Sequence, residues 1–440
     1  MTRAHWAPGG VDASFEEAFT HRLSGSPIRV VRVIHADLFG RQRAKQFPLS
    51  SWLSLADGVA YSKMASAEDL LGVPVAAEQF PSLKHHPDLF ARVAPSTARI
   101  PPWEPDALWV LASLEEEGRP SALCPRAQLQ AASDRLQEAQ GLSAVAAGEP
   151  EFYLFARADG TAYSQRGVSY TIDRVTDPDG VVGRIHRQLI ELGIGVTAVN
   201  REFSPGQFEI NLQHGDIVSA ADAAFLMKTG TKELAQIEGF DASFMAKPRT
   251  GAEGSSLHVH LSLWRDGSNA FADPAGPDGL SAIARHGIAG LQQHADALMA
   301  FAAPTVNSYK RLTGESLSPR HSNWGLDNRF TFIRIPPERG NATRLELRGG
   351  DASASPHLLM AAMLHAIRDG IDRELEPRDD GLALPADLAD SVDALESSEL
   401  FRSGFGDELI DVYAALKRRE VEAYRAHVSD WERDVYAAQV

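Results

Sequence analysis

The sequence predicts an α+β fold divided into two domains of unequal size. At 440 residues the chain is longer than one hydrophobic core usually supports. Short segments with strand-like alternation are interleaved with longer segments of helical periodicity, and no short-period repeat is present. This mixed order is typical of α+β proteins. We expect a small first domain over residues 1–115 and a larger second domain over residues 116–440.

The individual elements follow from the spacing of apolar residues. IRVVRVIHADLFG, which follows Pro27, alternates as a half-buried strand does. Just beyond the expected boundary, RAQLQAASDRLQEAQ repeats Leu129, Ala132 and Leu136 at helical spacing. In the larger domain we predict strands at EFYLFA, GQFEINLQ, SLHVHLSLW and RLELR, and helices at 219–238, 279–301, 353–374 and 405–425.

Composition narrows the functional classes. The formal net charge is −16 and no long Lys/Arg run occurs, which argues against nucleic acid or an anionic membrane as partner. No apolar stretch approaches the ~20 residues that span a bilayer, and the first residues lack a secretory apolar segment, so we expect a cytoplasmic protein. The single cysteine, Cys124, is expected to be structural.

Four predicted strands carry charged or imidazole groups at alternate positions. Residues two apart on a strand share a face, so these faces would converge on a cavity while the apolar faces pack the core. For any single pair, the solvated face of an antiparallel sheet is the simpler interpretation, but four pairs together favour a site. The pairs are Glu149 and Glu151, Glu209 and Asn211, His258 and His260, and Glu346 and Arg348.

Carboxylates that converge in a partly buried cavity need compensating cations. An oxygen-rich set with one imidazole suits Mg²⁺ or Mn²⁺ better than zinc. Guanidinium groups near the same strands bind phosphate and carboxylate bidentately, so metal and arginine together indicate phosphoryl transfer. No P-loop or kinase-type motif is present, so metal ions and arginines would have to bind the nucleotide. The arginines are Arg311, Arg329, Arg334, Arg344 and Arg348.

Six segments in order resemble the motifs of the glutamine synthetase superfamily, class I type. They are GEPEFYLF, NREFSPGQFEINL, FMAKPRTGAEGSSLHVHLSL, NSYKRL, DNRFTFIRIP and RLELRGGDASASPHL. The resemblance covers nearly all of residues 120–440 and is looser over 1–115. It implies a β-grasp amino-terminal domain, then a catalytic domain whose antiparallel sheet forms a funnel-shaped site surrounded by helices. It also implies a homo-oligomer, a dodecamer of two stacked hexameric rings.

The resemblance also implies roles for single residues. Metal ligands would be Glu151, Glu202 and Glu209 for one ion and Glu149, His258 and Glu346 for another, with two or three Mg²⁺ or Mn²⁺ per site. ATP, the co-substrate, would be bound by His260, Ser262, Arg334 and Arg344. Glutamate would be bound by Gly254, Arg311 and Arg348, with Arg329 and Arg311 catalytic and Arg329 on the transferring phosphate.

The sequence departs from an ammonia-using member where ammonium would bind. Leu317 stands at the position of one carboxylate, although Glu315 lies two residues away and offers an alternative. The segment VAYSKMAS replaces the other carboxylate, with Ser62 or Lys63 near the expected aspartate, and Lys63 would repel ammonium. Glu253 replaces an asparagine beside the glutamate-binding glycine, which leaves the acid substrate open.

We therefore expect a relative of the γ-glutamyl-polyamine and γ-glutamyl-amine synthetases, in which the acid is activated but the nucleophile is an amine. Leu317 would accept the carbon chain of a polyamine, an alkylamine or an ethanolamine-like compound. Glu68 and Asp69 offer a site for a distal ammonium, although such a pair is more often a helix-start or surface feature. The alternatives are an ammonia-dependent glutamine synthetase, a non-catalytic structural relative, a ligase for another acid, and a guanidine kinase. Some bacterial members of the family are regulated by adenylylation of a tyrosine. The corresponding segment here, EPRDDGLALPADL, shows no counterpart of that tyrosine, so we do not expect this regulation.

Overall fold

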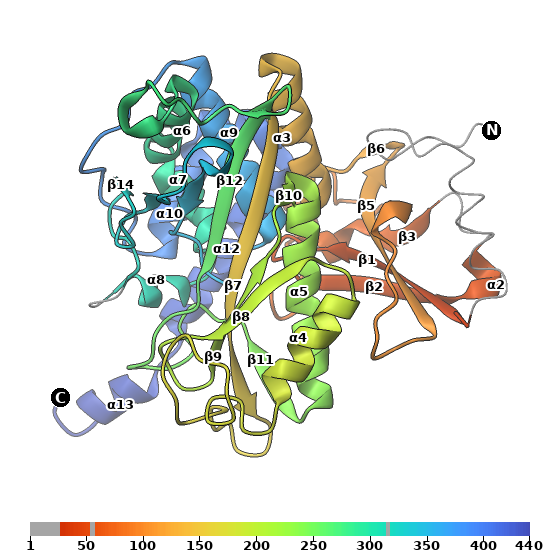
Figure 1. Ribbon diagram of the computed structural model, residues 1–440. Coiled ribbons are helices and arrows are strands. Elements are labelled where there is room, and N and C mark those ends of the chain that lie inside the picture. The colour runs from red at the N-terminus through yellow and green to blue at the C-terminus, as the bar shows by residue number, and fades with distance from the viewer. Residues whose placement is uncertain (1–26, 53–57, 314–316) are drawn as a thin grey trace.

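The computed structural model describes residues 27–52, 58–313 and 317–440 (Figure 1). The first sheet has the strand order β2-β1-β5-β4-β3, with β6 beside β5. Strand β1 runs antiparallel to β2 and parallel to β5. The bounds are β1 Val30–Ala36, β2 Gln42–Pro48, β3 Val59–Ser62, β4 Asp88–Val93, β5 Ala107–Glu116 and β6 Arg119–Pro120, with the short helix α2 Leu49–Trp52 after β2.

The second sheet is larger and carries the polar positions identified in the sequence. Its order is β14-β15-β16-β12-β7-β9-β8, and β10, β11 and β13 pair at its margins. Every pairing is antiparallel except that of β14 with β15. The bounds are β7 Ser143–Ala156, β8 Val196–Arg201, β9 Gln207–Leu212, β10 Gly215–Asp216, β11 Phe240–Ser243, β12 Leu257–Arg265, β13 Ser268–Asn269, β14 Trp324–Leu326, β15 Ile333–Ile335 and β16 Leu345–Leu347.

Helices cover the second sheet, and the long strands β7 and β12 run through the centre of the molecule (Figure 1). The predicted helix at 279–301 is wrong in one respect, because it is two helices that meet at His294. The α-helices are α3 Pro125–Gln140, α4 Val181–Glu191, α5 Ile217–Ile237, α6 Ala282–Gln293, α7 Ala295–Ala302, α8 Ser308–Arg311, α9 Pro356–Asp372, α10 Leu388–Ser397, α11 Glu399–Phe405, α12 Asp407–Ala426 and α13 Asp430–Tyr436. Single 3₁₀ turns lie at Lys63–Ala67, Ala77–Gln79, Pro95–Thr97, Pro277–Gly279 and Gly340–Ala342.

The apolar side of the second sheet is its core side. Phe152 on β7 and Phe208 on β9 are fully buried in one cluster with Phe225 of α5. Val259 on β12 and Leu347 on β16 are fully buried in a second cluster that includes much of α9. Because side chains alternate along a strand, the polar residues between these positions are directed to the opposite side of the sheet. The expected division of each strand into an apolar and a polar face is confirmed.

Two further expectations concern single features. Cys124 is buried at the start of α3 and accepts a hydrogen bond from the Leu114 amide at 3.2 Å, so the structural role is confirmed.

Among the helices of the described ranges, none has the length and apolar character needed to cross a membrane. The α+β class is confirmed, with a strand-rich amino-terminal part. The division between residues 115 and 116 stays a prediction.

Candidate active site

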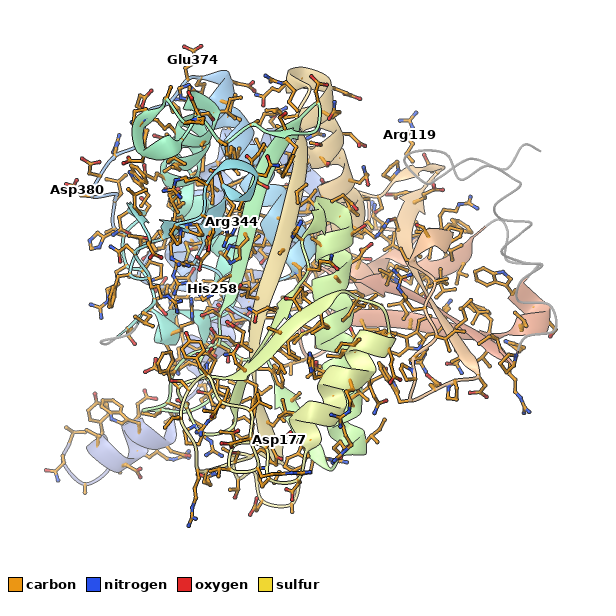
Figure 2. All side chains as sticks on the ribbon, viewed as in Figure 1. Arg119, Asp177, His258, Arg344, Glu374 and Asp380 are labelled. Atoms are coloured by element: carbon orange, nitrogen blue, oxygen red, sulfur yellow. The ribbon has the colours of Figure 1, made fainter. Side chains whose placement is uncertain are left out.

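The polar face of the second sheet lines a cavity of about 940 Å³. All but one of the sequence-predicted site residues line it, although they come from widely separated stretches of the chain. Ser262 is the exception and lines an adjoining cavity of about 480 Å³, which also includes Glu149, His260 and Arg344. Figure 2 places His258 and Arg344 along β12, near the middle of the molecule. The residues that line the larger cavity are Glu149, Glu151, Glu202, Glu209, Gly254, His258, His260, Arg311, Leu317, Arg329, Arg334, Arg344, Glu346 and Arg348.

Strand register brings the charged groups together. On β7, Glu149 lies opposite His258 of β12, and Glu151 lies opposite Glu209 of β9. On the other side of β12, His260 lies opposite Glu346 of β16. Residues directly opposite in a sheet have Cβ atoms only about 5 Å apart, so four strands deliver their polar side chains to one small volume.

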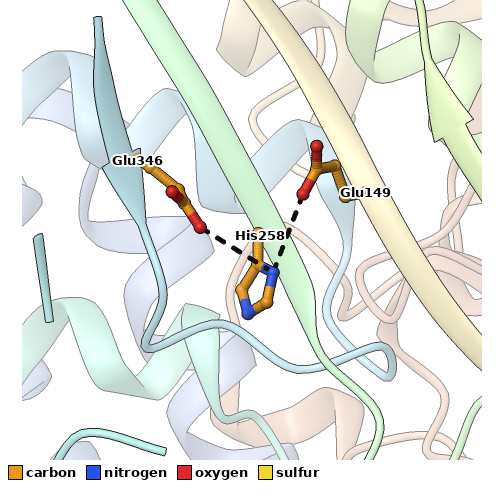
Figure 3. Close-up of side chains that lie close together, drawn as sticks. All are labelled: Glu149, His258 and Glu346. Atoms are coloured by element: carbon orange, nitrogen blue, oxygen red, sulfur yellow. Dashed lines mark ion pairs between the residues drawn. The ribbon is translucent and has the colours of Figure 1, made fainter. Parts of the chain in front are cut away.

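One cluster consists of Glu149, His258 and Glu346 (Figure 3). The Nδ1 atom of His258 is 3.9 Å from Glu149 Oε2 and 4.0 Å from Glu346 Oε1. One potential ligand atom from each residue lies within 4.8 Å of the other two. Burial, with the charge of Arg348 next, lowers the pKa of His258, which favours the neutral imidazole that binds metals.

A second cluster joins two further carboxylates to His258. Potential ligand atoms of Glu151, Glu209 and His258 also lie within 4.8 Å of one another. Glu151 accepts hydrogen bonds from the Gln207 side chain at 2.9 Å and the Ser256 amide at 3.0 Å. Glu202 and Glu209 each accept one from an asparagine two residues away along the chain. Amide donors therefore orient these carboxylates without neutralising them.

The carboxyl groups of Glu202 and Glu209 have raised pKa values. Burial, with the charge of Glu151 next, raises the pKa of Glu209 to about 9 and that of Glu202 to about 7. Glu149 behaves oppositely, because the imidazoles of His258 and His260 outweigh the effect of burial and hold its pKa well below the usual range. Raised carboxyl pKa values mark unbalanced negative charge, which a divalent cation would neutralise.

Arginines line the same cavity, and two of them, Arg334 and Arg348, pair with Glu346. Burial acts to raise the pKa of Glu346, but the two histidines, Arg348 and Arg334 lower it to about 2. Arg334 Nη1 lies 2.6 Å from Glu346 Oε2. Arg344 donates to His260 Nδ1 at 3.2 Å. The site thus pairs an electronegative group of carboxylates with guanidinium groups, an arrangement that suits phosphate held through metal ions.

Arg311 and Gly254 lie at the base of the cavity. Arg311 is buried, and its Nη2 donates to Ser256 Oγ at 2.9 Å and to the Arg348 carbonyl at 3.2 Å. The Gly254 carbonyl accepts a hydrogen bond from Gln207 at 2.9 Å, so the residue is tied to the strand that carries Glu209. A buried guanidinium held beside the Gly254 backbone is suited to a carboxylate-bearing substrate.

Comparison with known proteins agrees with this geometry. Residues 122–436 match the family described as glutamine synthetase, catalytic domain. The chain belongs to the glutamine synthetase family. It is 32% identical to a glutamine synthetase of Rhizobium leguminosarum bv. phaseoli over 92% of this chain and 96% of the relative. It is also 32% identical to a glutamate–isopropylamine ligase of a Pseudomonas species, over 92% of this chain and 94% of that one.

Solved structures of the family share the fold. A GmaS complex with ADP superposes with a TM-score of 0.85 at 30% identity, covering 95% of this chain and 99% of that one. A structure described as a novel glutamine synthase homolog superposes with a TM-score of 0.83 at 31% identity, covering 92% and 97%. Glutamine synthetase family members are ligases that use ATP and divalent metal ions. The predicted family and fold are therefore confirmed.

Leu317 lines the cavity and is 37% exposed, and its place at the nucleophile end of the cavity stays a prediction. Glu315, the alternative carboxylate, lies outside the described residues.

Lys63 differs from the expectation. It is fully buried, 2.6 Å from Glu116 Oε2 and 2.7 Å from Glu408 Oε1. Because two carboxylates neutralise its charge within the chain, repulsion of ammonium by Lys63 was a wrong inference.

The expectation for Glu68 and Asp69 is also corrected. Glu68 Oε2 pairs with Arg43 at 2.9 Å, and Asp69 Oδ2 pairs with Arg419 at 2.9 Å. Asp69 Oδ1 accepts hydrogen bonds from two backbone amides in the following turn. With both carboxylates already paired to arginines, this acidic pair is not a receptor for a distal ammonium.

Sequence reasoning missed several cavity residues. Gln207 lies two positions before Glu209 on β9, so strand alternation could have identified it. Tyr170, Phe203 and Phe330 also line the cavity, but they lie on loops where no periodic signal marks them. These three residues add exposed aromatic groups to a cavity that is otherwise lined mainly by charged and polar side chains.

Proposed function

We propose that this glutamine synthetase family ligase uses ATP to activate the γ-carboxylate of glutamate and joins it to an amine. The observation that carries the proposal is the composition of the cavity. The residues suited to metal and phosphate converge, while Leu317 presents an apolar group at the expected nucleophile position. The relative named glutamate–isopropylamine ligase gives independent support.

The donor set fits divalent cations. Glu149, His258 and Glu346 would hold one Mg²⁺ or Mn²⁺. Glu151 and Glu209, with Glu202 on the wall of the same cavity, would hold another. The raised pKa values of Glu202 and Glu209 support this assignment, since bound cations would offset the repulsion among these carboxylates. The ions, when bound, neutralise phosphate oxygens and so favour transfer of the γ-phosphoryl group.

The adjoining cavity supports the assignment of the nucleotide. Its walls include Trp264, Ser262 and His260, with Arg344 where the two cavities meet. Arg329 and Arg334 lie on the loop and strand that end with β15 and line the same cavity, and Arg334 pairs with Glu346 of the metal cluster. We assign Arg329 to the transferring phosphate, because charge that develops there is stabilised by a guanidinium already in position.

The acid would bind at the base of the cavity. Arg311, Arg348 and Gly254 form a surface for the carboxylate-bearing end of glutamate. The γ-carboxylate oxygen attacks the terminal phosphorus of ATP, giving γ-glutamyl phosphate and ADP. The amine, after losing one proton, attacks the acyl carbon through its lone pair. The carbon–oxygen bond to phosphate then breaks and the nitrogen loses a second proton, giving the amide and inorganic phosphate.

Two further proposals follow from family membership. We propose a homo-oligomer of two hexameric rings, and a cytoplasmic location. Sedimentation or mass photometry of the purified protein should report about twelve subunits, and a monomer with full activity would contradict the assembly.

The function is tested by incubating the enzyme with ATP, glutamate and Mg²⁺ plus either ammonium or a panel of amines. We expect phosphate release and a γ-glutamyl amide detected by mass spectrometry with amines. Phosphate release that saturates at low ammonium, with no amide from any amine, would make the enzyme a glutamine synthetase, like the Rhizobium relative. Glu151→Ala should abolish turnover while the fold stays assembled, and full activity would refute its metal role.

A further inference from the structure

The entrance of the active-site cavity carries three exposed aromatic side chains, which we call the aromatic rim. It comprises Tyr170, Phe203 and Phe330, which are 59%, 54% and 66% exposed. All three line the same cavity as the metal-binding candidates and Leu317. Exposed aromatic groups that cluster around a polar cavity are unfavourable in water and gain contact area when an apolar ligand binds.

From this arrangement we propose that the aromatic rim and Leu317 select primary amines with an apolar body, arylalkyl amines such as benzylamine above all. The inference rests on the proposed amine ligase function and names the acceptor class. It differs from the polyamine and ethanolamine classes, which carry further polar or charged groups.

The rim is held in place by the backbone. Tyr170 has a left-handed backbone conformation with φ of 60°, and its amide donates to the Arg201 carbonyl at 2.9 Å. Arg201 also donates through Nη1 to the Arg166 carbonyl. A positive φ is uncommon for tyrosine, and these hydrogen bonds hold the backbone of Tyr170 in that conformation.

Each ring lies next to a residue that we place in the reaction. Arg329 Nη1 donates to the Tyr170 hydroxyl at 2.9 Å, so that hydroxyl is bound to the guanidinium assigned to the transferring phosphate. Phe203 follows Glu202 in the chain and meets Tyr170 edge to face, with ring centroids 6.4 Å apart. Phe330 follows Arg329, and its amide donates to Asn328 Oδ1 at 3.0 Å. An amine whose nitrogen reaches the acyl carbon would lay its body against these rings.

The charges around the entrance favour a single ammonium. Glu253 lines the cavity and attracts the cationic head before it loses its proton. A second ammonium at the far end of a polyamine would instead meet apolar rings and the guanidinium of Arg329. The acidic pair Glu68 and Asp69 offers no compensation, because both side chains are bound to arginines.

The test compares methylamine, benzylamine, cyclohexylmethylamine and putrescine as acceptors with the full-length enzyme, ATP, glutamate and Mg²⁺. We expect kcat/KM for benzylamine to exceed that for methylamine and for putrescine by about 10-fold or more, given ~25 cal/mol for each Å² of apolar surface buried. Phe203→Ala and Phe330→Ala should each lower the ratio of benzylamine to methylamine by roughly 5- to 10-fold. Phe203→Leu, which keeps an apolar side chain, should lower it less.

The matched control is Ile237→Ala. Ile237 is 62% exposed at the end of α5 and lies outside the cavity lining, so its truncation should leave the ratio unchanged. Equal use of benzylamine and methylamine by the wild type, or a preference for putrescine, would overturn the rim as a selector. An unchanged ratio in both alanine variants, when size-exclusion chromatography shows that they still assemble, would also overturn it. A wild-type enzyme that makes no amide even with methylamine would instead refute the amine ligase function itself.

Discussion

Gly254 lies directly against the side chain of Arg311. A Cβ atom at residue 254 would come within 2.5 Å of Arg311 Cγ and within 2.7 Å of the Ala246 carbonyl oxygen. The backbone conformation itself does not require glycine, since its φ is not in the left-handed region. Glycine is needed here because the arginine packs over it.

We predict that Gly254→Ala displaces Arg311 and weakens binding of the acid. KM for glutamate should rise by about 10-fold or more, since misplacing a bidentate guanidinium costs at least ~1.4 kcal/mol. Binding of ADP with Mn²⁺, measured by calorimetry, should change little. Gly215→Ala is the control, because a Cβ there meets nothing within 4 Å and the residue, on β10, does not line the cavity assigned to glutamate. An unchanged glutamate KM in Gly254→Ala would contradict the placement of the acid.

Burial of Glu209 beside Glu151, which raises its pKa to about 9, predicts an unusual effect on stability. In the metal-free protein, Glu209→Gln removes one carboxylate from a buried cluster, so the metal-free variant should melt above the metal-free wild type, by roughly 2 °C or more. The rise in Tm on adding Mn²⁺ should be smaller in the variant, because the ion loses a ligand. Differential scanning calorimetry with EDTA and with Mn²⁺ measures both.

Glu191→Gln serves as the control, since Glu191 is exposed at the end of α4. It should change neither Tm. A metal-free Glu209→Gln protein less stable than the wild type would mean that Glu209 is not in a repulsive cluster.

Leu317→Glu tests the nucleophile end of the cavity. A carboxylate there would attract ammonium and disfavour an apolar chain, so the ratio of kcat/KM for ammonium to that for an alkylamine should rise by about 10-fold. Leu326→Glu introduces the same charge on an exposed residue of β14 outside the cavity and should leave the ratio as in the wild type. If Leu317→Glu also leaves it unchanged, the loop has been misplaced relative to the family.

The carboxylate and imidazole cluster was predictable from sequence because of strand geometry. Side chains on a strand alternate strictly, so the spacing of Glu149 and Glu151, or of His258 and His260, is enough to assign each pair to one face. Family resemblance then matched the strands to one another. The long second helix was predicted as continuous across His294 because the helical period of apolar residues carries on through the break.

Other features depend on tertiary contacts that leave no local pattern. The charge of Lys63 is cancelled by Glu116 and Glu408, which lie on distant parts of the chain. The aromatic rim comes from three loops, and only their folding around β9 and β15 brings Tyr170 to Arg329. Neither relationship has a spacing rule from which it could be inferred.

His365 gives the protein a pH-dependent stability apart from the active site. It lies on α9 with its ring edge to face with Phe405, at 4.9 Å between centroids. Its Nε2 has no hydrogen-bond partner among the described residues. Burial, with the nearby charges of Arg135 and Arg368, lowers its pKa to about 3.

Because the unfolded chain binds a proton at this residue below pH 6.5 and the folded chain does not until about pH 3, acid favours unfolding. The stability from a neutral His365 is present above pH 6.5 and is lost progressively as pH falls toward 3. In His365→Leu, the unfolding free energy should therefore fall less steeply with acidification than in the wild type. The difference in slope should be about 1.4 kcal/mol for each pH unit between about 5.5 and 4. Urea titrations across this range measure the slope. His427→Gln, at an exposed position, should keep the wild-type slope, and an equal slope in His365→Leu would show that His365 is protonated in the folded protein.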